Sequence, residues 1–186
     1  MTSSPTSETH RNCWIIDGSA RDDGNCRHLR ELLSKQLRDD NWYVEDIGVS
    51  DLVEPEFCSG CGRCRDGDCR ITDGFSFIFD LKSRIDLVIL LSPIHFSGLS
   101  AQAKYFVDRL NPLWYRHEDV HARFCAILIG GSPEPRFSNA ESELKAVSKG
   151  CGFEWSGVLE LSDSDRKAVG DYDGQALEFV RRVIGN

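Results

Sequence analysis

The stretch Ile85-Asp86-Leu87-Val88-Ile89-Leu90-Leu91 decides the fold, because it is a continuous apolar run with a single aspartate near its start. Such a run is typical of a strand in a parallel sheet that is covered on both faces. Two further apolar runs, Cys13-Trp14-Ile15-Ile16-Asp17 and 124–129, lie before and after it along the chain. We therefore predict a central strand over 85–91 with parallel neighbours.

Segments with helical periodicity alternate with the predicted strands. The expected strands are 13–17, 42–47, 85–91, 124–129 and 153–161, and the expected helices are 25–40, 74–81, 100–110, 139–149 and 173–184. The side chains expected to face inward from the helices over 100–110 and 173–184 are Ala103, Phe106, Val107, Leu110, Ala176, Leu177, Val180 and Ile184. This alternation, without internal repeats, predicts an α/β fold: a doubly wound five-stranded parallel sheet with helices on both faces. Residues 1–11 lack periodicity and are predicted to be a disordered tail.

Composition narrows the class of partner. The 22 basic and 30 acidic residues give a net charge of −8, which disfavours nucleic acid or an anionic membrane surface. No apolar run reaches the roughly 18 residues of a membrane span, and the polar amino terminus offers no signal peptide. We expect a cytoplasmic protein with no nucleic-acid and no membrane partner.

Four of the eight cysteines lie within one short loop: Cys58, Cys61, Cys64 and Cys69. Two x₂ spacings followed by one x₄ spacing can bring four thiolates to one point, and the interleaved glycines let the backbone fold back. Three interpretations remain open: a [4Fe–4S] cluster, structural zinc, and reduced thiols or a disulfide with no metal. Three other cysteines lie in or beside apolar runs and are expected in the core: Cys13, Cys125 and Cys151.

Two loops follow strands at positions where doubly wound sheets bind ligands, beyond the carboxyl ends of the strands. The loop from Gly18 to Cys26 opens into a helix amino terminus, which suits an anion, although an ordinary turn would look similar. It matches neither the P-loop nor the Rossmann pattern. In the loop over 92–100 we expect Pro93 to break the strand, and a flat apolar ring could stack there.

Three motifs in this order resemble the flavodoxin-like NAD(P)H-dependent FMN reductases, and most of all their iron–sulfur flavoprotein branch. The motifs are 16–21 with Gly24-Asn25, the cysteine loop, and 92–104 with Asp108-Arg109. The resemblance implies one FMN-binding domain over 12–186 that acts as an oxidoreductase or electron-transfer flavoprotein. It also implies NAD(P)H as electron donor, a small-molecule or protein electron acceptor, and a homodimer or homotetramer.

The resemblance also implies the site residues. By this resemblance, Ser19, Arg21, Asn25 and Cys26 bind the phosphate of FMN. Family members often have Ser or Thr where this chain has Cys26. The residues that hold the isoalloxazine ring are, by the same resemblance, Pro93, Ile94, His95, Phe96, Ser97 and Gly98. Those that approach its other edge are Gly130, Gly131 and Ser132. The resemblance implies that the [4Fe–4S] cluster is ligated by Cys58, Cys61, Cys64 and Cys69. No catalytic side chain is implied, because the cofactor carries the difficult chemistry.

Two other interpretations compete with this one. The chain could be a binding or electron-carrier module, stapled by zinc or an iron–sulfur centre, that turns over no substrate of its own. The run His117-Glu118-Asp119-Val120-His121 matches the H-E-x-x-H motif of zinc proteases. A strand is expected to start three residues after His121, which leaves little helix to present the two histidines. We interpret the run as a solvated connector.

Overall fold

The computed structural model describes residues 11–66, 69–76, 85–116 and 120–185. Its parallel sheet has the strand order β2-β1-β3-β5-β6, which is the flavodoxin-like order. The strands are β1 (Arg11–Asp17), β2 (Trp42–Gly48), β3 (Leu87–His95), β5 (Arg123–Ile129) and β6 (Glu154–Leu161). A two-residue strand, β4 (Gly98–Leu99), pairs antiparallel with the end of β3. The predicted fold class is confirmed, with β3 at the centre of the sheet.

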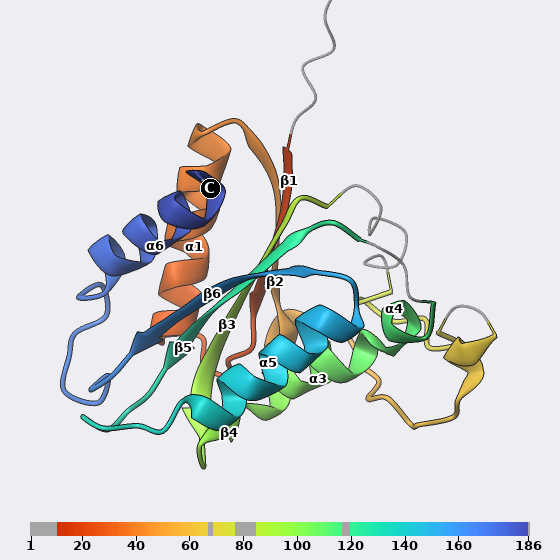
Figure 1. The fold of residues 1–186 in the computed structure, drawn as a ribbon. Coiled ribbons are helices and arrows are strands. Elements are labelled where there is room, and N and C mark those ends of the chain that lie inside the picture. Colours follow the sequence, from red (N-terminus) through yellow and green to blue (C-terminus); the bar gives the residue numbers. More distant parts are fainter. Residues whose placement is uncertain (1–10, 67–68, 77–84, 117–119, 186) are drawn as a thin grey trace, which may run out of the picture.

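Helices cover both faces of the sheet (Figure 1). On one face lie α1 (Asn25–Asp39) and α6 (Asp173–Gly185), and on the other lie α3 (Ala101–Arg109) and α5 (Ser138–Gly150). A short helix that was not expected, α4 (Asn111–Arg116), continues from α3, and 3₁₀ turns lie at Val49–Asp51 and Arg63–Arg65. Among the described residues, none of the helices is both long enough and apolar enough to span a bilayer.

The core consists of two apolar clusters, one on each face of the sheet. In β3, Val88 and Leu90 belong to the cluster under α3 and α5. Leu87, Ile89 and Leu91 belong to the cluster under α1 and α6. Successive residues of a strand point to opposite faces, so a strand covered on both faces must be apolar at every position. This requirement explains the uninterrupted apolar run in the sequence.

The expected inward faces of two helices are largely confirmed. All four predicted residues around α3 are buried: Ala103, Phe106, Val107 and Leu110. In α6, Ala176 and Val180 are buried as expected, whereas Leu177 and Ile184 pack only partly against the core. The other fully covered positions of this helix are Phe179 and Val183. The buried stripe of α6 is therefore rotated slightly from the predicted one. Cys13, Cys125 and Cys151 are buried, as predicted.

The prediction that Pro93 breaks the strand is wrong. β3 runs on to His95, and Pro93 pairs with Ile129 of β5. The carbonyl of Leu91 accepts a hydrogen bond of 2.8 Å from the backbone N–H of Gly18, just past the end of β1. Two residues later, Pro93 faces the same edge, where β1 has already ended. No acceptor of β1 lies there, so the absence of an N–H on Pro93 costs the sheet no hydrogen bond.

Some expectations fall outside the described residues. They are residues 1–10 of the predicted tail, most of the helix predicted at 74–81, and 117–119 of the H-E-x-x-H run. Arg11, placed in the tail by the prediction, is the first residue of β1. His121 has a φ of 52°, which is left-handed and therefore not the helical backbone that a zinc-protease motif needs.

Candidate functional site

A cavity of about 550 Å³ lies at the carboxyl ends of β1, β3 and β5. These strand ends and their loops form the lower edge of the sheet in Figure 1. The predicted residues that line the cavity are Ser19, Arg21, Asn25, Cys26, Pro93, Ile94, His95 and Gly131. The sheet thus brings together segments that are about 70 and 110 residues apart in the sequence, at the edge where doubly wound sheets bind ligands.

The loop after β1 leads into the uncapped amino terminus of α1 at the wall of this cavity. Its turn is held by the N–H of Ser19, which donates to Asp17 Oδ1 at 2.8 Å, and by the N–H of Arg21, which donates to Ser19 Oγ at 3.1 Å. At the N-cap of α1, Gly24 supplies no side-chain cap, and the first turn carries no acidic residue. The first N–H groups of a helix need an acceptor, and a phosphate at this positive end supplies one.

Two residues implied for the phosphate behave differently from one another. The Oδ1 atom of Asn25 is buried without a hydrogen-bond partner among the described residues, so the residue retains an unused polar atom at the start of α1. Cys26 borders the cavity, but its side chain packs in the core cluster under α1 and α6. Burial raises the pKa of this thiol well above its usual value. Cys26 is therefore a neutral packing residue.

The residues implied for the ring divide between the cavity and its surroundings. Pro93, Ile94 and His95 line the cavity, whereas Phe96 and Ser97 form the tip of the β3–β4 hairpin with left-handed φ values of 51° and 66°. The side chain of Phe96 is fully exposed. Gly98 pairs with His95, Gly130 packs against Pro135, and Ser132 is exposed; these residues do not belong to the cavity lining.

Sequence reasoning missed one wall of the cavity. The loop after β6 contributes Ser164, Asp165, Lys167 and Val169. This loop is tied to the loop after β5, because the N–H of Asp163 donates to the carbonyl of Ser132 at 2.7 Å. The available signal was topological: β6 is parallel to β5, so its carboxyl end lies at the same edge of the sheet.

Asp17 links the cavity loop to the pH dependence of stability. Burial raises the pKa of its carboxyl group to about 6, against the hydrogen bond from Ser19 and the charge of Arg30. A group with a raised folded-state pKa contributes stability below its unfolded pKa of about 3.9, and this contribution is lost as pH rises through about 6.

As pH rises from 4.5 to 7.5, we expect the free energy of unfolding of the Asp17→Asn variant to increase by about 1–3 kcal/mol relative to that of the unsubstituted chain. Asparagine keeps an oxygen for the Ser19 N–H and removes the buried charge. Urea unfolding of both proteins at the two pH values measures this, and the unsubstituted chain is the control for all other titrating groups. A stability difference that does not change with pH would contradict the prediction.

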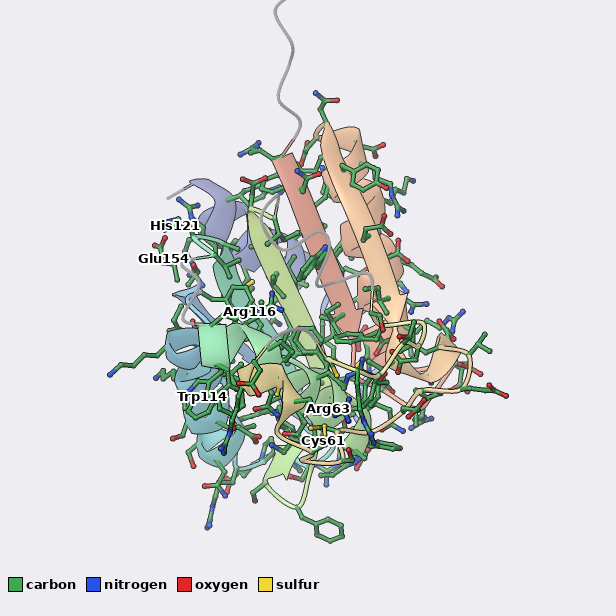
Figure 2. All side chains as sticks on the ribbon, turned by 90° about the vertical axis from the view of Figure 1, so that its right-hand side faces the viewer. Cys61, Arg63, Trp114, Arg116, His121 and Glu154 are labelled. Carbon is green, nitrogen blue, oxygen red and sulfur yellow. The ribbon has the colours of Figure 1, made fainter. Side chains whose placement is uncertain are left out.

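A second cavity, of about 100 Å³, brings together Cys58, Cys61, Cys64 and Cys69. Its wall also includes Arg65, Arg70, Arg109, Asn111 and Tyr115. Figure 2 views the molecule from the side of this loop and labels Cys61 and Arg63 on it. Within the described ranges, no three Cys, His, Asp or Glu side chains stand close enough together to hold a metal ion. The four thiols therefore border one cavity without forming a coordination shell.

The local structure of the cysteine loop favours the thiolate form of Cys61 and disfavours that of Cys64. Gly60 and Gly62 have φ values of 64° and 72°, the left-handed backbone that glycine adopts most readily. A hydrogen bond from the backbone N–H of Arg63 lowers the pKa of the Cys61 thiol, and Asn111 Nδ2 lies 3.6 Å from Cys58 Sγ as a donor. Partial burial, and then the neighbouring thiols, raise the pKa of Cys64. Hydrogen-bond donors beside Cys58 and Cys61 suit thiolate ligands, so the chemistry of the loop fits a thiolate-ligated metal centre.

The sheet order and the position of the larger cavity define a flavodoxin-like protein. A family model described as NADPH-dependent FMN reductase matches residues 12–151. The chain belongs to this family, which makes it an FMN-dependent oxidoreductase by class.

The curated relatives lie in the iron–sulfur flavoprotein branch. The chain is 33% identical over 174 residues to an iron–sulfur flavoprotein of Archaeoglobus fulgidus, covering 88% of this chain and 77% of that protein. It is 35% identical over 99 residues to an iron–sulfur flavoprotein of Methanocaldococcus jannaschii, covering 53% of this chain and 51% of that protein. These similarities confirm the resemblance stated from the motifs.

Solved structures share the fold at low sequence identity. An apo NADH:FMN oxidoreductase aligns with a TM-score of 0.63 and 16% identity, covering 94% of this chain and 89% of that one. A general stress protein from Treponema denticola in complex with FMN aligns with a TM-score of 0.61 and 9% identity, covering 94% of this chain and 98% of that one. The doubly wound architecture is therefore shared well beyond recognisable sequence similarity.

Proposed function

We propose that this protein passes electrons from NAD(P)H to a small-molecule or protein acceptor, with FMN in the larger cavity and a [4Fe–4S] cluster at the cysteine loop. The observation that carries the proposal is the cavity at the strand ends. One end of this cavity has the uncapped N–H groups of the first turn of α1, and the other end has an apolar segment of β3. Its volume of about 550 Å³ falls within the usual range of cofactor sites.

The residues of the chain have separable roles in this proposal. The backbone N–H groups at the start of α1, from Asn25 onward, would hold the phosphate, with the hydroxyl of Ser19 and the guanidinium of Arg21 beside it. Pro93 and Ile94 provide an apolar surface for the ring, and His95 borders its polar edge. Four cysteines ligate the cluster. When bound, FMN supplies two-electron and one-electron chemistry, and the cluster supplies one-electron chemistry.

The test is anaerobic purification followed by quantification of flavin and iron and by reduction with NADH and NADPH. We expect about one FMN per chain, a flavin spectrum that NADH or NADPH bleaches, and reoxidation by a quinone. Bound flavin that neither donor reduces would contradict the NAD(P)H linkage and favour an electron-carrier module. A colourless protein with stoichiometric zinc would contradict both cofactor assignments. Size-exclusion chromatography with light scattering tests the proposed homodimer or homotetramer.

Arg21 provides a prediction for the phosphate end of the site. Its side chain lines the cavity, is 76% exposed, and has Asp23 Oδ1 3.6 Å from its Nε. We expect Arg21→Ala to weaken FMN binding about tenfold and to leave riboflavin binding unchanged, because a charge-assisted contact to phosphate is lost. Isothermal titration of the apoprotein with the two flavins measures the difference.

Arg166→Ala is the matched control for Arg21→Ala. Arg166 is 72% exposed and pairs with Asp163 at 3.8 Å, but it does not line the cavity. Its removal should change neither affinity. Equal weakening of FMN and riboflavin by Arg21→Ala would show that Arg21 does not act on the phosphate.

A further inference from the structure

Arg109 is a buried cation at the wall of the cysteine cavity. It lies in the last turn of α3 and is 1% exposed, although it carries a full charge. It borders the same cavity as the four cysteines. A buried charge is stable only when it is paired and hydrogen-bonded, so the partners of its guanidinium indicate what the residue does.

One nitrogen of the guanidinium accounts for all of its described hydrogen bonds. Nη1 donates to Asp73 Oδ2 at 2.7 Å, to the carbonyl of Glu56 at 3.0 Å and to the hydroxyl of Tyr105 at 3.0 Å. The bonds to Glu56 and Asp73 fasten the two ends of the cysteine loop to α3, because these residues precede Cys58 and follow Cys69 in the chain. Arg109 therefore holds the loop at its base.

The remaining polar atoms of Arg109 have no such role. Nε and Nη2 are buried without a hydrogen-bond partner among the described residues. An arginine has five N–H donors, and leaving buried donors unpaired is costly. The guanidinium carbon lies 5.4 Å from the ring centroid of Phe75 and 5.6 Å from that of Tyr105, but these rings offer no strong acceptor. Sulfur atoms of a group held by the four cysteines of the same cavity would supply acceptors.

We propose that Arg109 donates hydrogen bonds from Nε and Nη2 to sulfur of the iron–sulfur cluster and thereby raises its reduction potential. This inference rests on the cluster assignment made under the proposed function. The reduced cluster carries one more negative charge, so a buried cation with hydrogen bonds to sulfur stabilises it more than the oxidised cluster. Arg65 and Arg63 lie on the loop surface, where solvent screens their charges.

The first test is a redox titration of the cluster, using dithionite as reductant and electron paramagnetic resonance as readout. Arg109→Lys retains the charge and a donor for Asp73, but it lacks Nε and Nη2. We expect the cluster to assemble in this variant and its reduction equilibrium to shift about tenfold toward the oxidised form, which is about 59 mV for one electron. An unchanged equilibrium would overturn the proposal.

Two controls separate this role from that of holding the loop. Asp73→Asn weakens the same clamp but removes a negative charge, so it should not shift the equilibrium toward the oxidised form. A shift in the same direction and of the same size as in Arg109→Lys would overturn the proposal. Arg63→Lys changes an exposed arginine that does not border the cavity, and it should leave the equilibrium unchanged.

A second measurement does not depend on how Arg109→Lys folds. In an Arg65→Lys/Arg70→Lys protein, Arg109 is the remaining arginine among the described residues that border the cavity. With its arginines labelled with ¹⁵N in the guanidinium, the reduced cluster should show a weak ¹⁵N coupling by pulsed resonance. Absence of this coupling would overturn the proposal. Unsubstituted protein without iron would overturn the cluster assignment as well, so the two failures are distinguishable.

Discussion

Cys61→Ser protein is expected to keep its FMN and to lose nearly all of its iron, from about four atoms per chain to fewer than about one. A hydrogen bond from the backbone N–H of Arg63 lowers the pKa of Cys61. The lowered pKa favours the thiolate form, which is the form that ligates a metal. Serine keeps the size of the side chain but offers no soft sulfur. Anaerobic iron and flavin quantification on the same sample measures both parts of the expectation.

Cys151→Ser is the matched control for Cys61→Ser. The thiol of Cys151 is buried, lies 3.8 Å from the carbonyl of Leu110 as a donor, and is remote from the cysteine loop in sequence. Serine can make the same hydrogen bond, so iron and FMN should remain at the level of the unsubstituted protein. Equal loss of iron in both variants would indicate general instability and would contradict the ligand assignment.

The fold was predictable because the pattern that defines it is local. A strand covered on both faces must be apolar at every position, and the run over 85–91 shows this directly. The loop after β1 was predictable for the same reason, since it stands immediately before the periodic residues of α1. The error at Pro93 had a different origin: whether a missing N–H breaks a strand depends on where the neighbouring strand ends, which no local pattern contains.

The parts of the site that were missed depend on tertiary contacts. Lys167 reaches the larger cavity from a loop after the last strand, and Asn111 and Tyr115 reach the cysteine cavity from α4. Arg109 belongs to a sequence motif, but its pairing with Asp73 joins residues that are 36 positions apart. Spacing rules identify ligands within one loop, and they do not identify the residues that hold that loop against the rest of the protein.

Asp73→Ala is expected to destabilise the folded protein by about 3–5 kcal/mol, because it leaves the charge of Arg109 buried without its counterion. The side chain of Asp73 is 3% exposed and that of Arg109 is fully buried. The carboxylate accepts hydrogen bonds from Arg109 Nη1 and the Tyr105 hydroxyl, both at 2.7 Å, and from the N–H of Glu56 at 3.0 Å. Urea denaturation at pH 7 measures the free energy of unfolding.

A surface pair provides the control for the buried pair. Asp46 forms an ion pair with Arg38, which is about half exposed, so Asp46→Ala should cost less than about 1 kcal/mol. If Asp73→Ala cost no more than Asp46→Ala, the Asp73–Arg109 pair would contribute no more than a surface pair. An Asp73→Ala/Arg109→Met double variant should recover part of the lost stability, because it removes the unpaired charge together with its partner.

The pH dependence of the Asp73 contribution should be opposite to that of Asp17. Burial alone would raise the pKa of Asp73, but the hydrogen bonds from Arg109, Tyr105 and the backbone of Glu56 hold it well below its usual value. A depressed folded-state pKa stabilises the protein above the unfolded pKa of about 3.9, and this contribution is lost as pH falls further. The stability difference between the unsubstituted protein and Asp73→Ala should therefore shrink in acid, whereas that of Asp17→Asn changes between pH 4 and pH 6. Asp17 accepts a hydrogen bond from Ser19, which lines the larger cavity, and Asp73 accepts one from Arg109, which borders the cysteine cavity. These opposite trends would therefore separate the energetics of the loop after β1 from those of the cysteine loop within one protein.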